Sequence, residues 1–198
     1  MSTVQVRQQY TPDNLLTMPD GKHYELVDGQ RVERGASALS SLVALEIGSL
    51  LRNHCKANNL AWVFGSDCGY RCFPGNKVRR ADVSFVHRDR LPADRLGDGY
   101  IEIAPDLAVE VVSPHDLVYE VDQEVDDYLA AGVRLVWMVN PERRTVWVYR
   151  VDGPVRFLRE PDELSGEDVL PGFRCLVSEL FPPMPAAAQP APVSPSSG

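Results

Sequence analysis

The chain has 198 residues, of which 44% are hydrophobic and 24% charged, and its formal net charge is -8. These values are typical of one soluble globular domain with a sizeable core. No apolar run approaches the ~20 residues that cross a bilayer, and the N-terminus lacks the layout of a signal peptide, so we expect a cytoplasmic protein without a membrane partner. The acidic net charge argues against indiscriminate nucleic-acid binding, which needs clustered Lys and Arg. The spacing of the four cysteines completes no zinc set.

The N-terminal half begins with a helix and a hairpin. Thr11 is a candidate N-cap because proline, which suits the first turn of a helix, follows it. Two short strands, 24–27 and 30–33, flank an Asp-Gly pair that favours a tight primed turn. Between residues 36 and 56, apolar side chains recur at helical spacing, which predicts the longest helix of the chain.

The rest of the chain alternates mainly strand patterns with one further helix. We expect this helix to begin with Ser113 as its N-cap, to carry an apolar stripe through Tyr128, and to stop at Gly132. A short helix is expected near residues 177–180. The predicted strands are 61–64, 69–73, 83–86, 107–112, 135–139 and 145–149, with a final strand pair near 155–158. This order predicts an α/β (α+β) domain in which helices flank a mixed β-sheet.

Composition sets the expected boundaries of this domain. The stretch from residue 182 to the end is rich in Pro, Ala and Ser and has no core-forming pattern. We therefore expect a flexible N-terminus over residues 1–9, one folded domain over 10–181, and a disordered tail over 182–198.

Two acids occupy positions where a carboxylate is costly. Glu110 interrupts an almost wholly apolar strand, and Asp82 opens another. Two carboxylates brought together at strand ends can bind a divalent cation, and Mg²⁺ commonly takes one or two carboxylates together with waters and phosphate oxygens. Alternatively, each acid pairs with an arginine or caps a helix, and Arg80 lies close to Asp82 in the sequence. The residue types alone favour this second interpretation.

Three segments of the chain carry a resemblance to a known family. They run from Arg80 through Val86, from Ala104 through Pro114, and from Tyr128 through Glu142, and the hairpin motif Tyr24–Gly29 precedes them. In order and spacing, these segments resemble the Uma-type family of restriction-endonuclease-like proteins, a branch of the PD-(D/E)XK superfamily. The resemblance covers about residues 10 to 181.

The resemblance implies a restriction-endonuclease-like core and a metal-dependent endonuclease that hydrolyses DNA. The implied metal ligands are Asp82, Glu110 and Val111, with Mg²⁺ or Mn²⁺ as the cofactor. The chain departs from the family at two positions. Ala81 stands where a proline usually precedes the aspartate, and Glu124 stands where the family has a helix lysine.

Glu124 bears directly on catalysis, and we include it with Asp82 and Glu110 among the candidate catalytic residues. All three lysines of the chain precede Asp82, so no later lysine can replace the missing one. A lysine would orient the attacking water and stabilise charge in the transition state, which a glutamate does not do in the same way. Glu124 is then an extra metal ligand, the mark of a lost catalytic group, or a solvated helix glutamate.

Several weaker candidates and alternatives remain open. Glu25 can support a metal through a water, and His115 can transfer protons, although each also suits a structural role. The basic residues between Lys77 and Arg95 form either a solvated loop or a rim that faces phosphates. Besides a nuclease, the chain can be an inactive binding or regulatory protein, or a homodimer in which strands such as Thr145 to Arg150 pair across a two-fold axis.

Overall fold

A six-stranded mixed sheet forms the centre of the computed structural model, which describes residues 8–35, 37–114 and 116–183. Its strand order is β3-β4-β5-β6-β7-β8. β5 and β6 run parallel, and every other neighbouring pair is antiparallel. The strands are β3 (Ala61–Gly65), β4 (Val83–His87), β5 (Leu107–Val111), β6 (Leu135–Asn140), β7 (Thr145–Arg150) and β8 (Arg156–Arg159).

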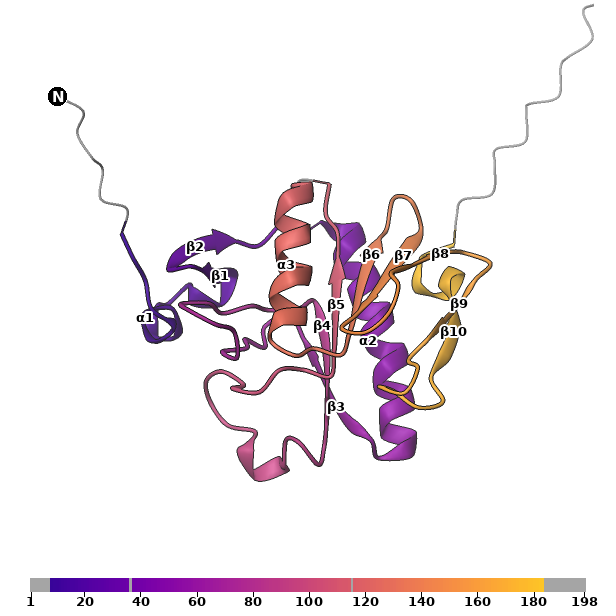
Figure 1. The fold of residues 1–198 in the computed structure, drawn as a ribbon, viewed down its shortest axis with the longest axis horizontal. Helices are drawn as coiled ribbons and strands as arrows, with labels where there is room; N and C mark the ends of the chain where they lie inside the picture. The colour runs from indigo at the N-terminus through magenta and orange to yellow at the C-terminus, as the bar shows by residue number, and fades with distance from the viewer. Residues whose placement is uncertain (1–7, 36, 115, 184–198) are drawn as a thin grey trace, which may run out of the picture.

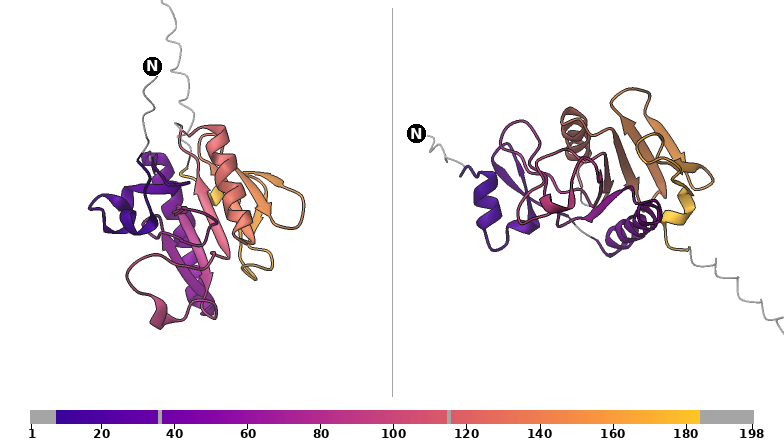
Figure 2. Two further views of the ribbon diagram at one scale, coloured as in Figure 1. Left: turned by 60° about the vertical axis from the view of Figure 1, so that its left-hand side comes forward. Right: turned by 90° about the horizontal axis from the view of Figure 1, so that it is seen from below.

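One long helix covers each face of the sheet, as Figures 1 and 2 show for α2 (Ala38–Asn58) and α3 (Val118–Ala130). α3 connects the parallel strands β5 and β6, the usual arrangement of a βαβ crossover. Because side chains alternate along a strand, Leu107, Val109 and Val111 pack with α2, whereas Ala108 packs with α3. Glu110 therefore belongs to the face of the sheet that α3 covers.

The N-terminal segment forms a small unit beside the sheet. It consists of α1 (Pro12–Thr17), the 3-10 helix η1 (Gly21–His23), and the hairpin of β1 (Tyr24–Val27) and β2 (Gln30–Glu33). Asp28 and Gly29 have φ angles of 49° and 79°, as a primed turn requires. Leu26 pairs with Val78 through two backbone hydrogen bonds of 2.9 and 3.0 Å. This pairing fixes the hairpin next to the segment that leads into β4.

Residues after β7 complete the packing on the α2 side. β9 (Glu163–Ser165) and β10 (Arg174–Leu176) form a separate two-stranded sheet, and the 3-10 helix η3 (Val177–Leu180) follows. A further 3-10 helix, η2 (Ala93–Arg95), lies in the loop between β4 and β5. Phe173, Cys175 and Leu180 are buried in the same core cluster as α2.

The predicted N-terminal helix, hairpin, long helix and five of the six predicted central strands are confirmed, and the observed fold is the predicted mixed sheet flanked by helices. Thr11 is the N-cap of α1, with a capping box. The predicted strand 69–73 is wrong, because Tyr70 makes isolated bridges to Arg79 and Ile101 instead of joining a sheet. The predicted pair near 155–158 is one strand, β8, at the sheet edge.

The predicted start of the second long helix is also wrong. α3 begins at Val118, with Leu117 as an N-cap that provides no side-chain hydrogen bond. The Ser113 amide instead donates to Asp116 Oδ2 at 2.6 Å in a turn before the helix. The predicted helix at 177–180 is a single 3-10 turn. His115 lies outside the described residues, as do most of the predicted flexible segments 1–9 and 182–198.

The structure contradicts the predicted mode of dimerisation. β7 is hydrogen-bonded to β6 on one side and to β8 on the other, so Thr145–Arg150 has no free edge with which to pair across a two-fold axis. No helix in the described part of the chain combines the length and the apolar composition that crossing a membrane requires.

Candidate functional site

Strand register brings the two candidate acids together. Val83 pairs with Val109 in the antiparallel ladder of β4 and β5, so the next opposed pair beyond the ladder is Asp82 with Glu110. Directly opposed residues of antiparallel strands have Cβ atoms ~4.5–5.5 Å apart and point to the same face. Asp82 and Glu110 are distant in the sequence, but they therefore form a close cross-strand pair at one end of the sheet, beneath α3.

Asp82 is oriented by hydrogen bonds from both sides. Its Oδ2 accepts the backbone N–H of Val111 at 2.8 Å, and its Oδ1 accepts from Arg34 Nη2 at 3.1 Å. Burial raises the pKa of Asp82 above its usual value, whereas the Val111 amide and the Arg34 charge lower it. The effect of removal from water on the pKa is larger than the opposite effect of the two donors, so the charge of Asp82 is not fully compensated.

The charge of Glu110 is compensated even less than that of Asp82. Its Oε1 accepts a hydrogen bond from the Tyr128 hydroxyl at 2.6 Å. Burial raises the pKa of Glu110 well above its ordinary value, and the charges of Glu124 and Asp82 raise it further. The Tyr128 hydroxyl opposes this shift. The charged form of this half-buried carboxylate is therefore disfavoured, and a cation that the protein chain itself does not supply would stabilise it.

Glu124 faces the same space from α3. Its Oε1 lies 3.3 Å from Arg79 Nη1, and its side chain is 27% exposed. Burial raises the pKa of Glu124 to about 8, with a further contribution from the negative charge of Glu25, while Arg79 lowers it. Glu124 therefore lines the acidic site and is not a solvated helix glutamate.

A buried arginine holds the acidic groups at the back of the site. Arg79, 3% exposed, donates to Asp127 Oδ2 from Nη2 at 2.6 Å and from Nε at 3.0 Å, and to Glu25 Oε2 at 2.8 Å. Asp127 also accepts from Lys77 at 2.6 Å, and Glu25 from the Arg80 amide at 2.5 Å. Glu25 is therefore occupied by structural partners, and the Arg79 charge is shared among three carboxylates. Charge-assisted networks of this kind are strong only while all members are present.

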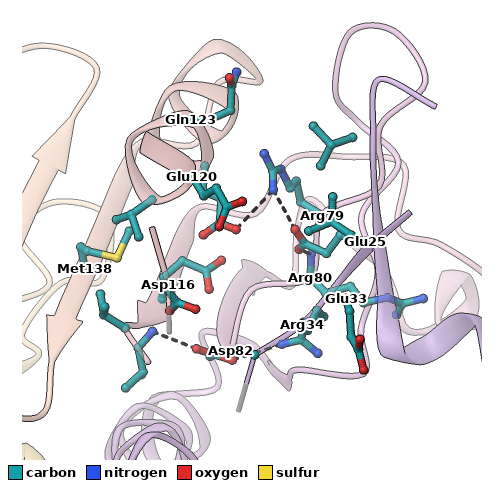
Figure 3. Close-up of a pocket in the computed structure, with 18 of the residues that line it drawn as sticks. Glu25, Glu33, Arg34, Arg79, Arg80, Asp82, Asp116, Glu120, Gln123 and Met138 are labelled. Carbon is teal, nitrogen blue, oxygen red and sulfur yellow. Dashed lines mark hydrogen bonds and ion pairs between the residues drawn. The ribbon is translucent and has the colours of Figure 1, made fainter. Parts of the chain in front are cut away.

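Most of these residues line a cavity of about 270 Å³, which we call the carboxylate cavity (Figure 3). In Figure 3, Arg79 reaches towards Glu25 at one side, and Arg34 lies beside Asp82 at the other. Acidic side chains outnumber basic ones in its lining. The ionisable lining residues are Glu25, Glu33, Arg34, Arg79, Arg80, Asp82, Glu110, Asp116, Glu120 and Glu124.

The carboxylate oxygens of the site meet part of what a hard divalent cation requires. Within the residues that the structure describes, no three His, Cys, Asp or Glu side chains are arranged as a ready-made metal centre. Mg²⁺, however, commonly takes only one or two carboxylates and completes its shell with water and substrate phosphate. Asp82 and Glu110 fit this requirement, because both are oxygen donors, adjacent and short of positive charge.

The structure gathers all four sequence-predicted site residues around this cavity, namely Asp82, Glu110, Val111 and Glu124. It also reveals contributors that the sequence did not indicate. Arg34 follows the hairpin directly, and Tyr128 was expected only as part of an apolar stripe. For Arg34, its position directly after the predicted hairpin was the available signal. For Tyr128, the available sequence signal was its position one helical turn after Glu124.

The basic stretch is mostly not a phosphate-facing rim. Arg90 pairs with Asp106 at 2.7 Å, and the Arg88 guanidinium stacks 3.7 Å from the ring centre of Trp62. Arg80 donates to the backbone carbonyls of Tyr24 and Asp67. Together with the engagement of Lys77 and Arg79, these contacts give most of the stretch structural partners and leave Arg95 exposed.

Comparisons with known proteins agree with this architecture. The model of the Uma2 family, described as "Putative restriction endonuclease", matches residues 10–178. A crystal structure from Anabaena variabilis ATCC 29413, described as a putative nuclease belonging to DUF820, superposes with a TM-score of 0.74 at 22% sequence identity, covering 86% of this chain and 97% of that one. At this identity the similarity shows a shared fold. A search of curated proteins gave no match.

Proposed function

The chain belongs to the Uma2 family of restriction-endonuclease-like proteins, and we propose that it is a metal-dependent nuclease that hydrolyses DNA phosphodiester bonds at Asp82 and Glu110. The observation that carries this proposal is the cross-strand pair itself. Both acids are half-buried at one sheet end, opposite each other in register, and removal from water raises the pKa of each. A divalent cation held by both acids would offset the cost of removing them from water.

Different residues of the chain orient Asp82 and Glu110. The Val111 amide and Arg34 fix both oxygens of Asp82, and the Tyr128 hydroxyl fixes Glu110 Oε1. This fixed orientation leaves Glu110 Oε2 and the remaining lone pairs of Asp82 for Mg²⁺ or Mn²⁺, and the backbone carbonyl of Val111 is the proposed third ligand. The bound ion would activate a water and stabilise charge on the phosphoryl group.

Glu124 provides the main argument for a second candidate, an inactive nuclease fold that binds without cutting. Arg79 is the buried cation nearest to the missing lysine's position, but Glu25, Asp127 and Glu124 already share its charge. It is therefore poorly placed to stabilise additional negative charge on a substrate. If activity survives, Glu124 must act otherwise, by accepting a proton from the attacking water or by binding the metal.

Cleavage assays with the full chain test the proposal. Plasmid and single-stranded DNA would be incubated with Mg²⁺ or Mn²⁺, and wild type would be compared with Asp82→Asn and Glu110→Gln. We expect metal-dependent cleavage that both substitutions abolish, while Glu142→Gln, an exposed acid in the β6–β7 turn, retains it. Cleavage that persists in both variants would refute the proposed site. A silent wild type that gains activity on Glu124→Lys would favour the second candidate.

A further inference from the structure

A row of side chains crosses the sheet from Glu110 to the edge strand β8. In the ladders of β5 to β8, Glu110 is opposite Met138, Met138 is opposite Trp147, and Trp147 is opposite Phe157. Opposed residues point to the same face of a sheet, so the row lies on the face that α3 covers. Because neighbouring strands are ~4.8 Å apart, Trp147 lies ~10 Å and Phe157 ~14 Å from Glu110 across the sheet.

The row ends in two exposed aromatic rings. Trp147 is 42% exposed and Phe157 is 39% exposed, and their ring centres lie 4.4 Å apart. The other two tryptophans of the chain have partners inside the protein. Trp137 is fully buried, and the Trp62 indole donates to the Leu91 carbonyl at 2.8 Å. Trp147 and Phe157 therefore form an aromatic surface that a ligand can reach.

A cationic hollow adjoins these rings, and we call it the β8 pocket. Its volume is about 480 Å³, and the Arg159 guanidinium lies 5.2 Å from the ring centre of Phe157. The one acid in its lining, Glu160, is paired with Arg144. Arg143 and Arg159 are exposed, and neither forms an ion pair with a residue that the structure describes. The lining residues are Arg143, Arg144, Thr145, Phe157, Arg159, Glu160 and Pro161.

The β8 pocket lies at the sheet end that carries the two acids. β5 and β6 run parallel, so Glu110 and Asn140 both lie towards this end. Thr145 is opposite Asn140 on one side and Arg159 on the other. α3 also begins at this end (Figure 1), and Tyr119 on its first turn is 68% exposed and lines the carboxylate cavity. A linear ligand in the pocket can therefore extend past the start of α3 to the acids.

Exposed rings beside unpaired arginines match the chemistry of single-stranded nucleic acid. Arginines contact the phosphates, and unpaired bases stack on aromatic rings, whereas the bases of a duplex are already stacked on their neighbours. The β8 pocket also differs in charge from the carboxylate cavity, because arginines outnumber acids in its lining. Both the rings and the charge thus favour a single strand as the ligand.

We propose that the Trp147–Phe157 pair and the β8 pocket together bind single-stranded DNA. Bases contact the two rings, Arg143 and Arg159 contact phosphates, and the strand continues towards the carboxylate cavity. That the bound strand is a substrate rests on the proposed nuclease function. Binding itself does not, because it needs no metal and no cleavage. The two proposals can therefore fail separately.

Binding without divalent metal tests the role of charge. The full chain would be titrated with a fluorescent single-stranded oligonucleotide in EDTA at several salt concentrations. We expect Arg159→Ala to weaken binding and to reduce the slope of log K against log salt by about 0.7, the value for one phosphate contact on a single strand. Arg95→Ala is the matched control and should bind like wild type, because Arg95 is equally exposed but lies in η2, at the other end of the sheet.

A second variant tests the rings apart from charge. Trp147→Val removes the indole and keeps a side chain that suits a strand. Binding should weaken about fivefold or more, the lower limit for one stacked base, while the salt slope stays unchanged. Binding should also quench the tryptophan fluorescence of wild type but not that of Trp147→Val. Val151→Ala, at an exposed apolar position in the β7–β8 loop, is the control.

Thermal unfolding would verify that each variant is folded. The proposal is overturned if folded Arg159→Ala and Trp147→Val bind as tightly as their controls, if wild type binds no oligonucleotide at low salt, or if a duplex of equal length binds as tightly as the single strand. Metal-free binding by a protein that cuts no DNA would support this site and contradict the nuclease function. Metal-dependent cleavage without metal-free binding would do the reverse.

Discussion

The Val111 amide donates a 2.8 Å hydrogen bond to Asp82 Oδ2, which ties the first acid to the residue that follows the second acid. The backbone of β5 thereby determines the distance between the two carboxylates. A side chain at position 111 has no part in this contact, so Val111→Ile or Val111→Leu should preserve it.

Removing the Tyr128 hydroxyl should weaken metal binding. Tyr128→Phe deletes the donor to Glu110 Oε1 and leaves this half-buried carboxylate without its hydrogen bond. Loss of such an outer partner typically costs about 10–100-fold in metal affinity, and calorimetric titration with Mg²⁺ or Mn²⁺ would measure it. Tyr149→Phe, a partly exposed tyrosine on β7, is the control. Equal affinities in both variants would show that Tyr128 does not orient Glu110.

Glu124 should make the metal-free protein less stable as the pH rises. Its pKa is 4.5 in the reference state and about 8 in the fold. Between these values the folded state binds a proton that the unfolded state has lost, so the free energy of unfolding falls with pH, by at most about 1.4 kcal/mol per pH unit. Glu110 contributes in the same direction.

Denaturant unfolding at a series of pH values in EDTA checks this prediction. Glu124→Gln should flatten the fall in stability between these two pH values without removing the contribution of Glu110. Asp126→Asn, at an exposed position of α3 outside the lining of the carboxylate cavity, should not change the profile. A profile of Glu124→Gln identical to that of wild type would mean that Glu124 is not protonated in the fold.

Arg79 should be the most costly arginine of the chain to remove. Arg79→Ala leaves Glu25 and Asp127 buried without their main counter-charge, which typically destabilises a protein by about 3–5 kcal/mol. Arg174, 64% exposed in its pair with Glu163, should cost at most about 1 kcal/mol. Equilibrium unfolding in denaturant would compare the two. A similar, small cost for both would contradict the structural role assigned to Arg79.

Much of this arrangement could be predicted from local sequence. The helical spacing of apolar residues identified α2, and the Asp-Gly pair identified the hairpin. The most useful signal for the site was an acid inside an apolar strand, because a polar group in that position needs a partner. This signal singled out Glu110 inside one strand and Asp82 at the start of another, and the family resemblance then implied that both bind a metal.

The network behind the site could not be predicted in this way. Arg79 and Asp127 are 48 residues apart in sequence, and only the packing of α3 on the sheet brings them together. The prediction for 69–73 failed for a related reason, because alternating β-prone residues indicate extended backbone but not a partner strand. At Ser113, the capping pattern was satisfied by a turn that precedes α3.

Metal binding by calorimetry, with wild type beside Asp82→Ala, tests the central claim most directly. We predict that wild type binds Mg²⁺ or Mn²⁺, that Asp82→Ala does not, and that both proteins are folded at the temperature of the experiment. Binding that persists unchanged in Asp82→Ala, or its absence from folded wild type, would contradict a metal site at Asp82 and Glu110.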